Sequence, residues 1–235
     1  MELIHANLTD VVERTSSVKS WRFKLEKPLK FKAGQFLRVI FDTENMSNSN
    51  LNKFLSFSCA PDKDYIEFTK RLSNSEFSKR LLKLKPNDRI SLEAPMGNCV
   101  LSENDKKIAF LIGGIGITPV ISIIEHVVEK KLPINVTLIY SNRSEDDIAF
   151  KSELNIWARN SNIDILHTIT DCTPKEENCL RGLITKELIE NKIPDYRSRA
   201  IFIFGPPIMV SSIKNICLEL NCNADMIRAE NFVGY

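Results

Sequence analysis

The feature that most constrains this chain is an uncharged stretch at positions 108–124, with the sequence IAFLIGGIGITPVISII. A short apolar run ends in Gly113, Gly114 and Gly116, and apolar residues then recur at the spacing of one helix face. This pattern predicts a buried strand, a tight glycine turn and the start of a helix. Pro119 suits the first helical turn, where its missing N–H has no partner to lose.

A glycine turn that opens a helix favours the binding of an anion. Glycine lets a ligand approach the backbone closely, and the exposed N–H groups at a helix start attract phosphate. We therefore expect a nucleotide pyrophosphate here. The spacing GGxGxTP differs from the GxGxxG fingerprint, so a strand, turn and helix without a ligand is the alternative. A membrane helix fits poorly, because glycines and a proline interrupt a stretch shorter than the roughly 20 residues required.

Charge and cysteine content exclude several classes of function. Lys and Arg total 32 against 30 Asp and Glu, so no strong field attracts nucleic acid. The six cysteines form no CxxC pair and match no zinc or iron–sulfur spacing. We expect no metal site, and thiols that stay reduced in the cytoplasm. The N-terminal sequence MELIHANLTD also lacks the features of a secretion signal.

The pattern of predicted strands and helices changes along the chain and divides it into two domains, 1–101 and 102–235. The first is predicted to be a small antiparallel β-barrel, with strands near 20–25, 36–41, 65–70 and 89–93 and a helix at 75–84. The second is predicted to be an α/β domain with a doubly wound parallel sheet. Its expected strands are 108–112, 135–140, 164–168 and 201–204, and its expected helices are 118–130, 147–160, 185–191 and 208–220. The polar segment SENDKK forms the boundary.

Several further motifs accompany the glycine turn in a fixed order. They are Gly34-Gln35-Phe36, KFLSFSCAP at 53–61, Pro95-Met96-Gly97, Gly205-Pro206-Pro207 after the strand IFIF, and the final segment ENFVGY. In this order and spacing, the whole chain resembles the ferredoxin–NADP⁺ reductase family. The resemblance implies a flavin-binding barrel followed by a pyridine-nucleotide domain, with FAD as cofactor and NAD(P)H as substrate.

The family's flavin motif R-x-Y-S-x-x-S corresponds to a strand that begins Lys53-Phe54-Leu55-Ser56. The resemblance implies that Lys53 faces the flavin pyrophosphate and that Ser56 lies beside flavin N5. Lysine replaces the usual arginine, so a point charge stands in for a bidentate fork. Leu55 replaces the usual tyrosine and removes an aromatic platform. Phe57, two residues further along the strand, is the nearest candidate to replace it.

A second flavin segment follows in the barrel. The resemblance implies that the strand carrying Phe68, Thr69 and Lys70 runs past the flavin. It also implies that the next helix directs the N–H of Phe77 and the hydroxyl of Ser78 toward the pyrophosphate. The helix dipole supports that placement. The alternative is that the serines here act only as N-caps.

Matching positions in the second domain imply a coenzyme site. The turn residues Gly113, Gly114, Gly116 and Thr118 correspond to the pyrophosphate turn, and Gly205 and Pro206 to the turn beside the nicotinamide, where Phe204 replaces the family's cysteine. Ser141 and Arg143 correspond to the position that reaches the adenosine ribose. An arginine there favours NADPH. Pairing of Arg143 with Asp146 or Asp147 at a helix start is the alternative.

The final segment is acidic and aromatic, as in the family. By resemblance, Glu230 polarises the nicotinamide side, and Tyr235 stacks on the flavin and yields to the nicotinamide. Ser56, Glu230 and Tyr235 are therefore the expected catalytic residues. A disordered tail is the alternative.

These expectations describe a reductase that passes a hydride from NAD(P)H to flavin N5 and then electrons to a separate acceptor, or operates in reverse. Ferredoxin, flavodoxin or an iron–sulfur subunit are the acceptors we consider, and the basic segment 79–85 suits an acidic carrier. A ferric or free-flavin reductase and a reductase subunit of a larger complex are alternatives. A non-catalytic nucleotide-binding scaffold is another, supported by the departures at Lys53, Leu55 and Phe204. Flavin absorbance would distinguish a scaffold.

Overall fold

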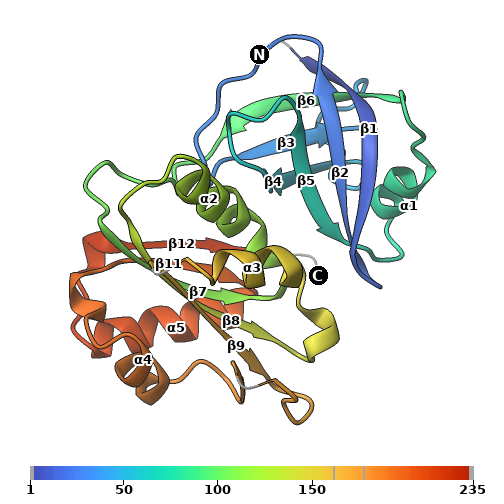
Figure 1. The fold of residues 1–235 in the computed structure, drawn as a ribbon. Coiled ribbons are helices and arrows are strands. Elements are labelled where there is room, and N and C mark those ends of the chain that lie inside the picture. The colour runs from blue at the N-terminus through green and yellow to red at the C-terminus, as the bar shows by residue number, and fades with distance from the viewer. Residues whose placement is uncertain (1–2, 161, 177, 233–235) are drawn as a thin grey trace. The chain divides into compact units, whose positions relative to one another are not determined.

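The computed structural model describes residues 3–160, 162–176 and 178–232, which form two compact units (Figure 1). The first unit contains Met1–Leu101 and Thr118–His126. The second contains Ser102–Ile117 and Val127–Tyr235. Most of one helix that starts in the second unit is therefore grouped with the first.

The first unit is built on a six-stranded antiparallel sheet, so the predicted antiparallel class is confirmed, although the expected strands did not include residues 4–15. In the order β4-β3-β6-β1-β2-β5, its strands are β4 (Asn52–Ser56), β3 (Phe36–Ile40), β6 (Arg89–Met96), β1 (Ile4–Thr15), β2 (Val18–Leu25) and β5 (Ile66–Arg71). An antiparallel bridge between Phe57 and Phe68 joins the two edges, so the sheet curls into a barrel. Helix α1 (Glu76–Lys83) connects β5 to β6.

Alternating apolar residues fill the barrel with aromatic rings. The ring of Phe68 stacks on those of Phe23 and Trp21 at 5.3 and 6.1 Å between centroids. Phe57 and Phe31 stack at 3.9 Å. Side chains on one face of each strand thus account for the core, as the period of two along a strand requires.

A buried carboxylate organises the polar face of β5. Glu67 is 2% exposed and accepts hydrogen bonds from Arg22 Nε at 2.8 Å and Ser58 Oγ at 2.9 Å. Arg14 donates to both of its carboxylate oxygens at 3.1–3.2 Å. Because a buried charge is costly unless it is paired and hydrogen-bonded, these contacts fix the position of β5.

The second unit has the predicted parallel sheet, in the order β10-β9-β8-β7-β11-β12. Its strands are β7 (Lys107–Gly113), β8 (Asn135–Asn142), β9 (Ile163–Ile169), β10 (Cys179–Arg181), β11 (Ala200–Gly205) and β12 (Ile227–Asn231). Its helices are α2 (Ile117–Glu129), α3 (Lys151–Trp157), α4 (Lys186–Lys192) and α5 (Pro207–Glu219). Within this sheet β7 is the first strand in chain order. Strands β8, β9 and β10 follow on one side of β7, and β11 and β12 then lie on its other side. The topological switch point therefore lies between β7 and β11.

Two edge strands were absent from the sequence expectation. β10 has three residues, and β12 has the sequence IRAEN, in which the first four residues are half-buried and the last is exposed. Neither shows the apolar run that marks a buried strand, because an edge strand is covered on fewer sides. Helix α3 is also shorter than the predicted 147–160, since Glu145–Asp147 forms a separate 3-10 turn.

Residues of α2 that belong to the first unit hold the loop after β4. Ser122 Oγ donates to the carbonyl of Cys59 at 2.6 Å. Glu125 accepts from the N–H of Ala60 at 2.6 Å and pairs with Lys63 at 3.2 Å. Among the residues that the structure describes, no helix is long and apolar enough to cross a membrane.

A buried histidine in β9 predicts that the folded protein loses stability as the pH falls. His167 is 0% exposed, and neither ring nitrogen has a hydrogen-bond partner among the described residues. Burial, followed by the charge of Lys151, lowers its pKa from 6.5 to about 4, while Glu176 and Glu145 oppose the shift. The unfolded chain therefore binds one more proton between these values, and the folded state loses about 3 kcal/mol as the pH falls through this window.

We expect His167→Phe to flatten the dependence of unfolding free energy on pH between 6.5 and 4, measured by urea titration with excess FAD. Thr168→Val, which changes the neighbouring buried residue without altering a titratable group, is the control and should leave the slope as in the wild type. An unchanged slope in His167→Phe would contradict the assignment.

Candidate functional site

The glycine turn lies at the switch point and packs directly on β11. β7 ends at Gly113, and Gly114–Gly116 forms a 3-10 turn before α2. A β-carbon at Gly116 would lie 2.5 Å from the carbonyl oxygen of Phe204, and one at Gly113 would lie 2.2 Å from Met209 Sδ. A side chain at Gly116 would force the two backbones apart, so glycine is required at that position, whereas at Gly113 the obstacle is the end of the flexible Met209 side chain.

Gly114 differs from its two neighbours. Its φ is +52°, and no heavy atom lies within 4 Å of the position that a β-carbon would take. The turn is therefore closed toward β11 and open beside Gly114. Thr118 is buried in the first turn of α2. This open side, at the start of a helix, is where an anionic ligand can reach backbone N–H groups.

The carboxyl end of β8 adds polar groups next to the turn. Ser141 is in register with Gly113, and Arg143 follows as an exposed residue. Between them, Asn142 is 6% exposed, and neither polar atom of its side chain has a hydrogen-bond partner among the described residues. The structure pairs Asp147 with the hydroxyl of Ser144 at 2.8 Å. Sequence reasoning missed Asn142, although it lies between two residues that were named.

A second turn meets the first at the end of β11. β11 ends at Gly205, and α5 begins at Pro207, with Pro206 as its N-cap. A β-carbon at Gly205 would lie 3.2 Å from the backbone nitrogen of Gly113. Glu230 is half-buried on β12, opposite Phe204. Tyr235 lies outside the described residues. The predicted coenzyme residues thus gather at the carboxyl ends of β7, β8 and β11.

In the first unit, two lysines offer a site for a phosphate group. Lys53 is half-buried on β4, and Lys70 is 6% exposed on β5. Burial, and then the positive charge of Lys53, lower the pKa of Lys70. A dianionic pyrophosphate between two such cations would relieve their repulsion. This donor set fits the pyrophosphate of FAD.

The remaining residues of β4 point in different directions. Leu55 is 5% exposed and packs in the core, and Ser56 is also buried. Phe54 is 59% exposed, and its ring lies 5.8 Å from Phe36 and 5.3 Å from the Arg38 guanidinium. Phe54 is therefore the exposed aromatic ring of this motif. Phe57 belongs to the core stack.

The side chains of two predicted β5 residues, Phe68 and Thr69, make contacts within the barrel. Phe68 lies in the core, and Thr69 Oγ1 is bonded to Ser20 Oγ at 2.6 Å and Ser58 Oγ at 2.7 Å. Lys70, by contrast, supplies its charged side chain.

The start of α1 is a serine cluster. Ser75 is the N-cap and accepts from Ser78 N–H at 3.3 Å. Ser78 Oγ accepts from Ser73 N–H at 3.2 Å. Phe77 is buried in the core, so its N–H is the group that can face a ligand. The capping alternative is therefore present in the structure.

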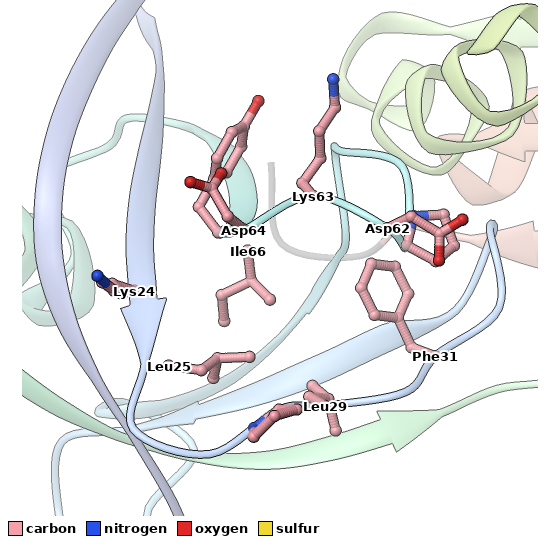
Figure 2. A pocket seen from close by; sticks show the side chains of 11 residues that line it. Lys24, Leu25, Leu29, Phe31, Asp62, Lys63, Asp64 and Ile66 are labelled. Atoms are coloured by element: carbon pink, nitrogen blue, oxygen red, sulfur yellow. The ribbon is translucent and has the colours of Figure 1, made fainter.

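The first unit also contains a hollow of about 360 Å³ away from these residues (Figure 2). Leu25, Leu29, Phe31 and Ile66 supply apolar lining, and Asp62 and Lys63 supply charged groups. None of the predicted site residues lines it. Among the described residues, no group of three or more His, Cys, Asp or Glu side chains could hold a metal ion.

Comparisons with known proteins identify a family model for part of each unit. Residues 5–101 match the family model of an oxidoreductase FAD-binding domain, and residues 110–215 match that of an oxidoreductase NAD-binding domain. The NADH-cytochrome b5 reductase 1 of Coccidioides immitis is 27% identical over 220 residues, covering 88% of this chain and 71% of the relative. The NADH-cytochrome b5 reductase 2 of Debaryomyces hansenii is 30% identical over 168 residues, covering 68% of this chain and 55% of the relative.

Solved structures share the fold. The cytochrome b5 reductase domain of Ulva prolifera nitrate reductase has a TM-score of 0.84 at 18% identity and covers 97% of both chains. A ferredoxin NADP⁺ reductase from Neisseria gonorrhoeae, crystallised with FAD and NADP, has a TM-score of 0.82 at 21% identity. That alignment covers 98% of this chain and 99% of the other.

The two kinds of glycine in the turn should respond differently to substitution. We expect Gly116→Ala to lower Tm by about 3–10 °C, because its methyl group meets the Phe204 backbone. Gly114→Ala has space, so its loss of stability should reflect only the strain of a positive φ, about 1–2 kcal/mol. Its methyl group should instead block the open side and weaken NAD⁺ binding about tenfold. Calorimetric melting and NAD⁺ titration check both, and equal effects of the two variants would refute the distinction.

Proposed function

Because the chain belongs to the family of FAD- and NAD-binding oxidoreductases that includes ferredoxin–NADP⁺ and cytochrome b5 reductases, we propose that it transfers electrons from NADH to a separate protein carrier. It is an NAD(P)H-dependent flavoprotein reductase. The coenzyme preference, the acceptor and the residue roles below are our proposals.

The observation that supports this proposal most is the meeting of two turns at the switch point. Open α/β sheets bind ligands at the carboxyl ends of their strands, where the strand order reverses. Gly116 and Gly113 pack against β11 and α5 at that place. The backbone N–H groups beside Gly114 then hold the coenzyme pyrophosphate, with Ser141 and Asn142 contacting its adenosine. Gly205 and Pro206 border the nicotinamide.

In this proposal the barrel would hold FAD, which would supply the chemistry that links a two-electron hydride donor to a one-electron acceptor. Lys53 and Lys70 neutralise its pyrophosphate, assisted by the N–H of Phe77 and the hydroxyl of Ser78 at the start of α1. Ser56 donates a hydrogen bond toward flavin N5 without blocking hydride approach. Glu230 and Tyr235 act on the nicotinamide side, as the family resemblance implies.

Charges around Arg143 favour NADH over NADPH. The sequence alone favoured NADPH, because arginine can bind a 2′-phosphate. However, Glu145, Asp146 and Asp147 form a 3-10 turn two residues further on. One exposed arginine beside three carboxylates provides little net attraction for a dianion. The curated relatives reported above are also named as NADH-dependent enzymes.

A basic face on and after α1 suits an acidic electron carrier. Lys79, Arg80 and Lys83 lie on the helix, and Lys85 follows it. Lys79 is paired with Glu76 at 2.8 Å. Complementary charge increases the association rate of electron-transfer partners. The relatives' names point to cytochrome b5 or ferredoxin as the kind of partner.

The first test is an absorbance spectrum of the purified protein, followed by anaerobic NADH and NADPH. We expect flavin bands that bleach with both coenzymes and faster with NADH. Faster bleaching by NADPH would overturn the coenzyme assignment. A protein without flavin bands that also takes up no added FAD would favour the non-catalytic scaffold. Rapid reduction of ferric chelates or free flavin, with no transfer to cytochrome b5 or ferredoxin, would favour the alternative reductase.

Lys53 provides a test of FAD binding that does not depend on turnover. Lys53→Gln removes one charge from the pyrophosphate site, so FAD affinity should fall about tenfold. Fluorescence titration of FAD into the apoprotein measures this affinity. Lys24→Gln, at an exposed lysine at the end of β2, is the matched control and should bind FAD as the wild type does. Equal affinities of the two variants would remove Lys53 from the site.

A further inference from the structure

The hollow in the first unit lies between two connections of the barrel (Figure 2). Strand β2 ends at Leu25 and β5 begins at Ile66, and the chain after β2 and the chain before β5 both line the hollow. Its volume of about 360 Å³ lies within the range of pockets that bind small molecules. The hollow is therefore large enough for a small organic ligand.

Apolar side chains that belong to the barrel core form part of its wall. Ile66 is 2% exposed, and the ring of Phe31 stacks on that of Phe57 at 3.9 Å. Leu25 and Leu29 are partly buried and pack against the same core. The apolar body of a ligand would cover what remains exposed of these side chains, and removing apolar surface from water favours binding.

The loop before β5 is held from outside the hollow. Glu125 of α2 accepts from the N–H of Ala60 at 2.6 Å and pairs with Lys63 at 3.2 Å. Figure 2 shows the Lys63 side chain directed away from Phe31. The charge of Lys63 is thus balanced by Glu125, and the loop has a fixed position before any ligand binds.

Charged groups of both signs surround the apolar wall. Lys24 and Asp64 are exposed, and neither is paired with another side chain among the described residues. Asp62 and Lys63 complete a lining of two positive and two negative groups, which has no net charge. A ligand with one charge would meet a repelling group as well as an attracting one, whereas a zwitterion can pair with both.

We propose that the hollow binds a small zwitterion with an apolar body, the chemistry of a free apolar α-amino acid. Asp64 pairs with its ammonium group, Lys24 pairs with its carboxylate, and its side chain packs against Phe31 and Leu29. None of the residues assigned to FAD or to the coenzyme lines this hollow. The inference is therefore independent of the proposed function.

The first test titrates four probes into the full-length protein in excess FAD, followed by saturation-transfer NMR. L-Phenylalanine should bind. Phenylpropionate lacks the ammonium group and phenethylamine lacks the carboxylate, so each should bind about tenfold more weakly. Glycine, which lacks the apolar body, should bind more weakly still. Equal or tighter binding of either singly charged probe would overturn the proposal in favour of that ion.

Two variants assign each charge to its residue. Asp64→Asn should weaken the binding of L-phenylalanine about tenfold and weaken phenethylamine, but not phenylpropionate. Lys24→Gln should weaken L-phenylalanine and phenylpropionate, but not phenethylamine. Both residues are exposed, so both variants should melt at the wild-type Tm. Glu44→Gln, at an exposed acid outside the hollow, is the control and should bind every probe as the wild type does.

Two results overturn the inference. One is a wild type that does not bind L-phenylalanine, and the other is wild-type affinity for it in both Asp64→Asn and Lys24→Gln. Either result could occur with flavin reduction by NADH intact, so the proposed function would stand. A wild type that binds L-phenylalanine but takes up no FAD would reject the proposed function alone.

Discussion

The second unit depends on one backbone approach, in which the glycine turn after β7 rests on the end of β11. A β-carbon at Gly116 would lie 2.5 Å from the Phe204 carbonyl oxygen, so this contact exists only because the side chain is absent. From it follow the start of α2, the position of Gly205 beside Gly113, and the alignment of β12. The proposed coenzyme residues come from separate parts of the chain, and this contact brings their backbones together.

In the first unit, the corresponding constraint is the distribution of charge on β5. Glu67 is neutralised by two arginines and a hydroxyl inside the protein. Three residues further along the strand, the positive charge of Lys53 acts on the buried Lys70. The strand therefore neutralises its acid within the protein, while a bound anion would relieve the repulsion between the two lysines. Such an arrangement gives up stability at one position in favour of binding.

The sequence predicted features that depend on local pattern. The glycine turn, the antiparallel first sheet and the alternation of strands and helices all follow from residue spacing. It missed β12, because an edge strand needs no apolar run. It proposed Phe57 as a substitute platform, whereas the ring stacks on Phe31 in the core and Phe54 is the exposed ring. It also missed Asn142. Burial and the direction of a side chain on a curved sheet depend on partners distant in the chain, which a local pattern does not contain.

The position of β11 between β7 and β12 has a consequence for how the protein acquires its activity. Parallel neighbours require long connections, and pairings between distant residues form late because a large loop must first close. The proposed coenzyme site joins Gly113–Gly116 to Gly205, which lie far apart in the sequence, so it forms only after β11 has docked beside β7. Partly folded or newly synthesised molecules would hold a flavin barrel before they have a working coenzyme site. In the proposed function, reduction by the coenzyme is therefore a property of the completed fold.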